Sequence, residues 1–195
     1  MIFKIKFFLT LVFCFFILLS CQKKLVIKEV VFDNSSLEKI NINSANKEII
    51  ISYNSSFEEP YIEHVMNISP TDRVVSWLEN NIYTFGTLNK LVIDVQDASI
   101  SQKEIDGEIE VAGIIKKQKE YLYEIFFKIE FILYDESNQV LAKTNTKVLH
   151  TKTSDTFISI NEKESILDNL TLSALQDLSR KTYELLKIHM SDYIL

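Results

Sequence analysis

The chain has 195 residues, with 21 Lys and Arg against 27 Asp and Glu, so its formal net charge is −6. An acidic chain without clustered basic residues does not neutralise phosphates, which excludes nucleic acid as the expected partner. A hydrophobic content of 47% with only three glycines and two prolines predicts an ordered globular protein, and the length suits one domain.

The amino-terminal residues have the pattern of an export signal. Lys4 and Lys6 form a short cationic start, and the segment from Phe7 to Leu19 is uncharged and apolar. The sequence Leu18-Leu19-Ser20-Cys21 then places two aliphatic residues and a small residue directly before a cysteine. This order is that of a secretory signal followed by its cleavage site.

These residues resemble the lipobox of bacterial lipoproteins. The resemblance implies that residues 1–20 are removed as a signal peptide and that the thiol of Cys21 carries fatty acyl chains. Gln22, where an aspartate would imply retention in the inner membrane, implies the periplasmic side of the outer membrane. An uncleaved membrane anchor and ordinary secretion remain as alternatives. A helix over the apolar segment would be about 20 Å long against a hydrocarbon core of roughly 30 Å, which favours cleavage.

Cysteine usage agrees with this interpretation. Cys14 lies in the leader and Cys21 is the lipidated residue, so the mature domain has no other thiol. The sequence therefore predicts no disulfide, no thiolate metal site and no cysteine nucleophile. Loss of Lys4 and Lys6 leaves 19 basic against 27 acidic residues, a net charge of −8.

The region after the leader is apolar at first and then polar. Residues 21–39 are expected to form a lipid-anchored tether, and residues 40–195 a single α/β domain. Apolar residues at Val30–Phe32 and Ile40–Ile42 indicate that part of this region docks on the domain, for example as an edge strand. Glu48–Tyr53 is rich in β-branched residues and predicts the first strand of the sheet.

A helix is predicted to begin near Ser69. Ser69 suits the capping position and Pro70 the first helical position, and the carboxylate of Asp72 interacts favourably with the helix dipole. Largely apolar residues then recur at helical spacing. The predicted buried face consists of Val74, Trp77, Leu78, Asn81, Ile82 and Phe85. Gly86 is expected to end the helix in a left-handed cap.

Three strand candidates follow. Lys90–Ser101 alternates but changes phase near Asp97, which predicts a strand with a bulge. Residues 102–120 mix β-branched residues with glycine and charge, and are interpreted as a long loop or a short edge strand. Tyr121–Tyr134 alternates throughout and predicts a strand about 45 Å long. A polar turn joins it to Val140–Thr151, so the two form an antiparallel hairpin.

A long helix is predicted at the carboxyl end. Ser159 or Asn161 can cap it, each with a glutamate three residues later. The segment from Glu162 to Asp192 contains no glycine or proline. A helix of this size is about 45 Å long, which matches the length of the hairpin that it is expected to cover.

The order of elements is strand, helix, strand, strand, strand, helix. It predicts an α+β domain with an antiparallel or mixed sheet of about four strands and two helices packed on one face. The order resembles the sandwich of small outer-membrane lipoproteins, such as the lipopolysaccharide-assembly lipoprotein and the auxiliary lipoproteins of ABC-type lipid transporters. It also resembles the amino-terminal domain of the Tol-system propeller protein, and the stretch from Pro60 to Trp77 resembles an uncharacterised lipoprotein family.

Glu63 and His64, between two prolines, form the most site-like pair in the chain. Neighbouring side chains on an extended backbone point in opposite directions, so hydrogen bonds that hold the loop to the helix start at Ser69 are the preferred interpretation. A metal site would need His64 together with His150 or His189, and no ligand spacing supports it. The sequence contains no nucleophile elbow and no glycine-rich phosphate loop. We therefore expect no metal, no cofactor and no enzymatic activity.

The second face of the strand Tyr121–Tyr134 is the preferred interaction surface. Its apolar members are Leu122, Phe126, Ile132 and Tyr134, and Glu63 and His64 are the further candidates for an interaction surface. If both helices cover the other face, a partner must cover part of this one. Glu124, Lys128 and Glu130 on the same face indicate that the cover is partial.

The sequence thus predicts a lipid-anchored envelope protein that acts as a non-enzymatic accessory or scaffold subunit. Its partners would be the membrane, through the anchor, and a second envelope protein, with lipid or lipopolysaccharide transport as the candidate system. The alternative is a periplasmic module that binds a lipid or small ligand in a cavity between helices and sheet.

Overall fold

The computed structural model describes residues 32–111 and 114–195, so the leader, Cys21 and the first part of the tether lie outside the described residues. In chain order the elements are η1 (Asn34–Ser36), β1 (Ile40–Ile42), β2 (Asn46–Ile51), η2 (Glu63–Val65), α2 (Pro70–Asn81), β3 (Ile82–Thr84), β4 (Lys90–Val111), β5 (Ile114–Tyr134), β6 (Val140–Asp155), α3 (Ile160–His189) and η3 (Ser191–Tyr193).

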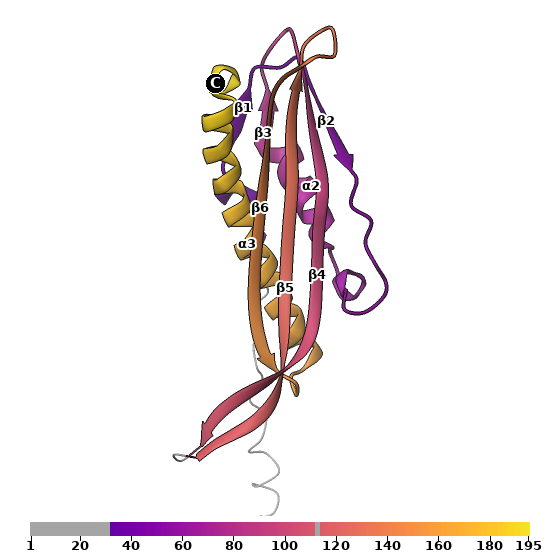
Figure 1. Ribbon diagram of the computed structural model, residues 1–195, viewed down its shortest axis with the longest axis vertical. Coiled ribbons are helices and arrows are strands. Elements are labelled where there is room, and N and C mark those ends of the chain that lie inside the picture. Colours follow the sequence, from indigo (N-terminus) through magenta and orange to yellow (C-terminus); the bar gives the residue numbers. More distant parts are fainter. Residues whose placement is uncertain (1–31, 112–113) are drawn as a thin grey trace, which may run out of the picture.

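A four-stranded sheet in the order β2-β4-β5-β6 forms one layer of the domain. β2 runs parallel to β4, whereas β4, β5 and β6 are antiparallel to their neighbours. α2 lies in the crossover between β2 and β4, as parallel pairing requires. Both helices lie on one face of the sheet, with α2 against β4 and α3 against β5 and β6 (Figure 1). The predicted α+β class is confirmed, and the sheet is mixed.

The β4–β5 hairpin is the longest feature of the molecule (Figure 1). Its ladder continues from Lys90 opposite Tyr134 to Val111 opposite Ile114. The interpretation of residues 102–120 as a loop or short edge strand was therefore wrong. The low apolar content of this segment made it look unlike a strand, but it pairs residue by residue with β5, and Lys119 lies 2.8 Å from Asp106 across the ladder. β6 pairs only as far as Glu120, so the hairpin continues beyond it as a two-stranded ribbon.

The bulge predicted near Asp97 is confirmed. The register of β4 against β5 shifts between Val95 and Asp97, so that one extra residue is inserted. This shift keeps Ala98 and Ile100 on the face that already holds Val95, and all three are fully buried. The bulge thus allows β4 to contribute core residues both before and after the point where its alternation of buried and outward-facing residues changes phase.

The core lies between the sheet and the helices. Alternate residues of β5, from Tyr123 to Leu133, are completely buried. The largest buried side chains are Trp77, Tyr123, Phe127, Phe131, Ile40, Ile42, Leu78, Ile82, Leu91, Ile93, Ile100 and Ile125. The long helix α3 packs along the β5–β6 half of the sheet, while the shorter α2 covers the β4 side (Figure 1).

Both helices start at serine caps. The hydroxyl of Ser69 accepts a hydrogen bond from the amide of Asp72 at 3.1 Å, as the sequence predicts. Of the two candidates for the last helix, Ser159 is the cap, since its hydroxyl accepts from the amide of Glu162 at 3.2 Å. α3 therefore runs over Ile160–His189, two residues earlier at its start than expected and three earlier at its end.

Gly86 does not end the first helix, so that prediction was wrong. α2 ends at Asn81, and the β-branched and aromatic residues that follow form β3, which pairs with β1. Gly86 instead lies against the turn between β1 and β2. A Cβ atom at this position would lie 2.6 Å from the Asn43 side-chain oxygen and 2.8 Å from the Ser44 amide nitrogen. The glycine is needed for close approach of two backbones.

The described part of the tether is docked on the domain. Leu37 is 5% exposed and belongs to the core. The side chain of Asn81 donates hydrogen bonds to the carbonyl oxygens of Asn34 and Leu37 at 2.9 and 3.0 Å. The amide of Glu38 donates to Ser179 on α3 at 2.8 Å. Residues 32–39 thus belong to the folded domain, which begins earlier than the expected boundary at residue 40.

Candidate interaction surface

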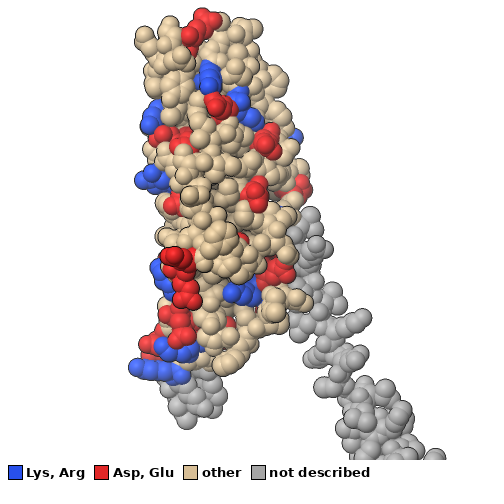
Figure 2. Space-filling view, turned by 90° about the vertical axis from the view of Figure 1, so that its right-hand side faces the viewer, with Lys and Arg blue, Asp and Glu red and all other residues tan. Residues whose placement is uncertain are grey.

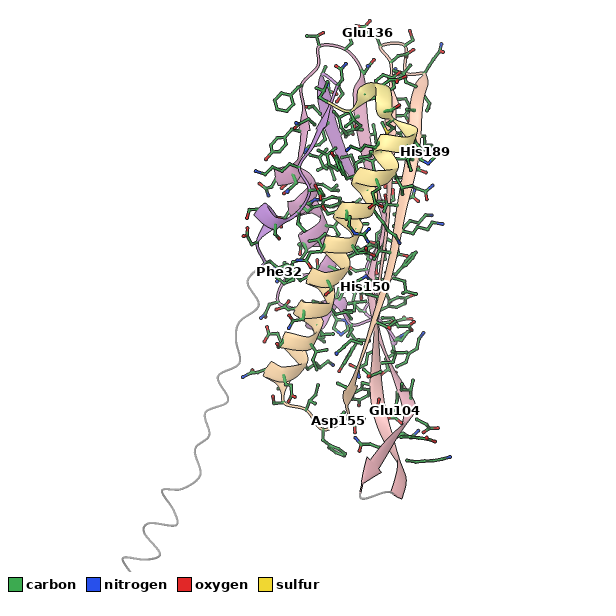
Figure 3. The ribbon with its side chains drawn as sticks, turned by 90° about the vertical axis from the view of Figure 1, so that its left-hand side faces the viewer. Phe32, Glu104, Glu136, His150, Asp155 and His189 are labelled. Atoms are coloured by element: carbon green, nitrogen blue, oxygen red, sulfur yellow. The ribbon has the colours of Figure 1, made fainter. Side chains whose placement is uncertain are left out.

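The four apolar residues predicted from the sequence lie on one strand and one face. Leu122, Phe126, Ile132 and Tyr134 alternate along β5 with the buried residues that face the helices. Each is half-buried by its neighbours in the sheet. Figure 3 shows α3 on one side of the sheet and the side chains of the opposite face projecting away from it. Within the part of the chain that the structure describes, no helix covers this opposite face.

Neighbouring strands extend the apolar character of this outer sheet face. Phe126 lies opposite Leu149 of β6, whose side chain is 59% exposed. Ile132 lies opposite Val92 of β4. Cross-strand pairs of this kind lie within contact distance, so they form short apolar stripes across the sheet.

Ion pairs separate the apolar stripes. Glu130 of β5 lies 2.9 Å from the ammonium of Lys143 on β6, and Glu124 lies 2.7 Å from Lys103 on β4. The Gln96 side chain, in the bulge, donates to Glu130 at 3.2 Å. Exposed pairs of this kind contribute little to stability, but they position charges that a partner can recognise. The outer sheet face therefore combines short apolar stripes with paired charges.

Glu63 is buried, so it lies outside any interaction surface; it makes hydrogen bonds within the loop region, as the preferred interpretation expects, but its partners are Tyr53 and Ile100 and not the helix start at Ser69. Its side chain is 3% exposed and points into the domain. One carboxylate oxygen accepts hydrogen bonds from the Tyr53 hydroxyl at 2.5 Å and from the Ile100 amide at 3.2 Å. Glu63 thus ties the η2 turn to β4 and to the segment after β2, which is a structural role. Burial, together with the hydrogen bond and charge of Glu63, raises the pKa of Tyr53 above its ordinary value.

His64 points away from its neighbour. It is exposed, and its ring lies 5.8 Å from that of Phe57. Glu63 and His64 therefore do not act together, as the sequence predicts. The three histidines do not converge either, because His150 faces Asp177 of α3 and His189 is exposed in the last turn of that helix (Figure 3). Among the described residues, no group of three His, Cys, Asp or Glu side chains has the arrangement of a metal site.

A groove that the sequence does not predict lies between β6 and α3. It has a volume of about 370 Å³ and is lined by His150, Thr151, Lys152, Ile166, Asn169, Leu170 and Ser173. The Nε2 atom of His150 lies 3.4 Å from Asp177. Burial raises the pKa of the Asp177 carboxyl, but hydrogen bonds from His150 and Arg180 outweigh this effect and hold the pKa below its ordinary value. Only packing of the helix on the strand brings these residues together.

The interior between helices and sheet is filled by side chains. Trp77 of α2 and Tyr123, Phe127 and Phe131 of β5 are completely buried there. Two grooves of the described chain open on its surface, one beside β6 and one beside η2. This packing gives no support to the alternative of a ligand held between helices and sheet.

Charges of both signs are mixed on one side of the molecule. Figure 2 shows Lys and Arg side chains interspersed with Asp and Glu over the side of the molecule turned toward the viewer. Within residues 32–111 and 114–195, none of the helices combines the length and hydropathy needed to cross a membrane.

Comparisons with known proteins give weak structural likeness and no sequence match. No family model matches the sequence, and no curated protein matches it significantly. Among solved structures, the chain is similar to a minor lipoprotein from Acinetobacter baumannii, with 8% identity and a TM-score of 0.37. The likeness covers 78% of this chain and 96% of that chain. A TM-score this low carries no argument about function, so the function of this chain has to be inferred from its own residues.

Proposed function

We propose that the protein is a lipid-anchored envelope lipoprotein that docks a partner protein on its outer sheet face and catalyses no reaction itself. The anchor would be the acylated Cys21, after removal of residues 1–20. The partner would belong to an envelope assembly, with lipid or lipopolysaccharide transport as the candidate system. The outer membrane, on its periplasmic side, is the proposed location.

The outer sheet face is the observation that carries this proposal. It joins half-buried residues of β5 to the exposed Leu149 of β6, and no helix of the described chain covers it. An apolar sheet face of this kind is typical of a protein contact surface. The flanking pairs Glu130–Lys143 and Glu124–Lys103 supply charges that a partner can match.

The edge strand β6 supports a side-chain contact rather than addition of a further strand. Its outer-face positions include Lys143 and Lys147, and Lys152 lies further along the same strand. Lysines on an edge strand oppose pairing with another strand. We therefore assign the contact to the face of the sheet and not to its edge.

Mass spectrometry of the purified protein tests the anchor. We expect a mature amino terminus at Cys21 with the added mass of acyl chains, and the Cys21→Ser variant should lack them. An intact leader on the wild-type protein would contradict the proposal.

Site-specific photocrosslinking tests the docking surface. A photoreactive residue at Phe126 or Leu149 should give the same discrete crosslinked species in the envelope, whereas one at the exposed Lys181 of α3 should not. Leu149→Arg should remove the crosslink formed at Phe126, because a buried unpaired charge opposes docking. A crosslink of equal yield from Lys181, or a species unaffected by Leu149→Arg, would show that the outer sheet face is not the contact.

A further inference from the structure

One end of the elongated domain carries several strongly exposed apolar side chains. They come from the segment around η2 and from the entry into α3. Their exposed fractions are 80% for Phe57, 53% for Val65, 45% for Ile68, 96% for Phe157 and 85% for Ile160. We call these five residues the end patch. Exposed apolar residues are ordinary when they are scattered, so their arrangement decides whether they form a surface.

The two segments of the end patch lie side by side. Val65 and Ile160 line the same groove, which has a volume of about 310 Å³ and the buried Leu167 of α3 in its wall. The side chain of Asn67 donates a hydrogen bond to Glu164 and so ties the η2 segment to α3. The η2 segment and the entry into α3 therefore meet at this groove, although they are about 95 positions apart in the chain.

The tether enters the domain near this end. The guanidinium of Arg73, in the first turns of α2, lies 3.1 Å from the ring centroid of Phe32, the first described residue. Arg73 also pairs with Asp168 of α3 at 3.4 Å. Asp168 is about 12 Å along α3 from Ile160 and about 32 Å from His189, at 1.5 Å per residue. Phe32 thus lies nearer to the end patch than to the carboxyl end of α3 at His189 (Figure 3).

The length of chain before Phe32 limits how far the domain stands from its membrane. Phe32 lies eleven positions after Cys21, so eleven Cα-to-Cα steps join them. Fully extended, they span at most about 40 Å. If Cys21 is acylated, the bilayer that holds the acyl chains lies within this distance of Phe32, and the end patch is among the surfaces nearest to it.

We propose that the end patch lies in the headgroup region of that bilayer and forms a second membrane contact, which stands the domain on this end. The proposal depends on the lipid anchor proposed above. Two aromatic and three aliphatic side chains suit the boundary between headgroups and acyl chains. Glu58, Glu59 and Glu162 flank the patch and outnumber the nearby cation Lys163, so the lipid headgroups that it contacts are zwitterionic rather than anionic. In this orientation the outer sheet face stands away from the membrane and stays accessible to a partner.

Fluorescence quenching by lipids tests the contact on the full, acylated protein. Acylation blocks Cys21, and the mature chain has no other cysteine, so a single new thiol can be labelled selectively. Phe157→Cys and Ile160→Cys place an environment-sensitive fluorophore in the end patch. Phe85→Cys and Ile188→Cys are matched controls, since these residues are 64% and 68% exposed near the opposite end. Each labelled protein is reconstituted in phosphatidylcholine vesicles that contain nitroxide-labelled acyl chains.

The expected result is at least about twofold quenching at residues 157 and 160 but not at 85 and 188, because an interfacial side chain lies roughly 5–10 Å into the boundary. Equal quenching at both ends would overturn the proposal. Protection from aqueous iodide without lipid quenching would also overturn it, since protein, including residues 22–31, would then cover the patch. A strong increase in lipid quenching at residues 157 and 160 when phosphatidylglycerol is added to the vesicles would contradict the assignment of zwitterionic headgroups. The mass of the amino terminus reports on the anchor separately, so failure of the anchor and failure of this contact are distinguishable.

Discussion

The ammonium group of Lys47 on β2 lies 2.7 Å from the carbonyl oxygen of Leu78 at the end of α2. The same group donates to the carbonyls of Ile82 at 2.7 Å and Glu79 at 3.3 Å. The last carbonyls of a helix have no partner within it, and they form the negative end of the helix dipole. A lysine from the neighbouring strand therefore ends α2 in place of the glycine cap that the sequence predicts.

Replacement of Lys47 by methionine should lower the free energy of unfolding by about 1–3 kcal/mol, because partly buried carbonyls lose a charged donor. Urea denaturation monitored by circular dichroism measures this change. Lys90→Met is the matched control: Lys90 pairs with Glu48, and their side chains are 45% and 48% exposed. Surface pairs contribute about 0–1 kcal/mol, so an equal loss in both variants would contradict a capping role for Lys47.

Gly86→Ala should destabilise the protein by about 1–3 kcal/mol, as expected for overpacking. The new Cβ would lie 2.8 Å from the backbone nitrogen of Ser44, so the β1–β2 turn must move. Gly107→Ala is the comparison, because its Cβ would meet the side chain of Glu120, which can rotate away. Thermal unfolding of both variants measures the difference. A Gly86→Ala variant that is as stable as Gly107→Ala would refute the close approach.

The hydrogen bond from Tyr53 to Glu63 predicts a pH dependence of stability. A raised pKa in the folded state means that this contribution is fully present below the ordinary tyrosine value of 10.0 and is lost as the pH rises above it. Tyr53→Phe should lower the free energy of unfolding at neutral pH by about 1.5–3 kcal/mol. The difference between wild type and variant should shrink above pH 10. Denaturant titrations of both proteins across this range measure it, and a difference that does not change with pH would contradict the expectation.

Trp77→Ala should cost about 3–5 kcal/mol, because the indole is fully buried between α2 and the sheet. The indole nitrogen has no hydrogen-bond partner among the described residues. Trp77→Phe should therefore cost clearly less than Trp77→Ala, since it loses volume without losing a bond. Chemical denaturation of the two variants measures both values, and a cost below about 0.5 kcal/mol for Trp77→Ala would refute the burial of this ring.

Most elements were predictable because they have strong local signals. Ser69 and Pro70 mark the start of α2, and Tyr121–Tyr134 alternates without interruption. The phase change near Asp97 is enough to predict the bulge, since period-two alternation leaves few other ways to keep one face buried. The apolar outer residues of β5 follow from the same alternation.

The wrong predictions concern segments whose structure depends on residues far away in the chain. Residues 102–111 form a strand because residues 114–123 pair with them along the ladder. Ile82–Thr84 forms β3 because β1 lies beside it. Glu63 is buried because Tyr53 and the Ile100 amide satisfy its carboxylate. The end patch was missed for the same reason: its two segments are far apart in the chain.

By itself, the sequence determined the periodic elements, the class of the fold and the expected export of the chain, because each depends on neighbouring residues or on spacing along one element. Only the tertiary structure decided which strands lie side by side, which carboxylate is buried and where exposed apolar side chains gather. Those outcomes depend on pairing, desolvation and packing between segments that are remote in the chain. Local sequence patterns do not predict such contacts.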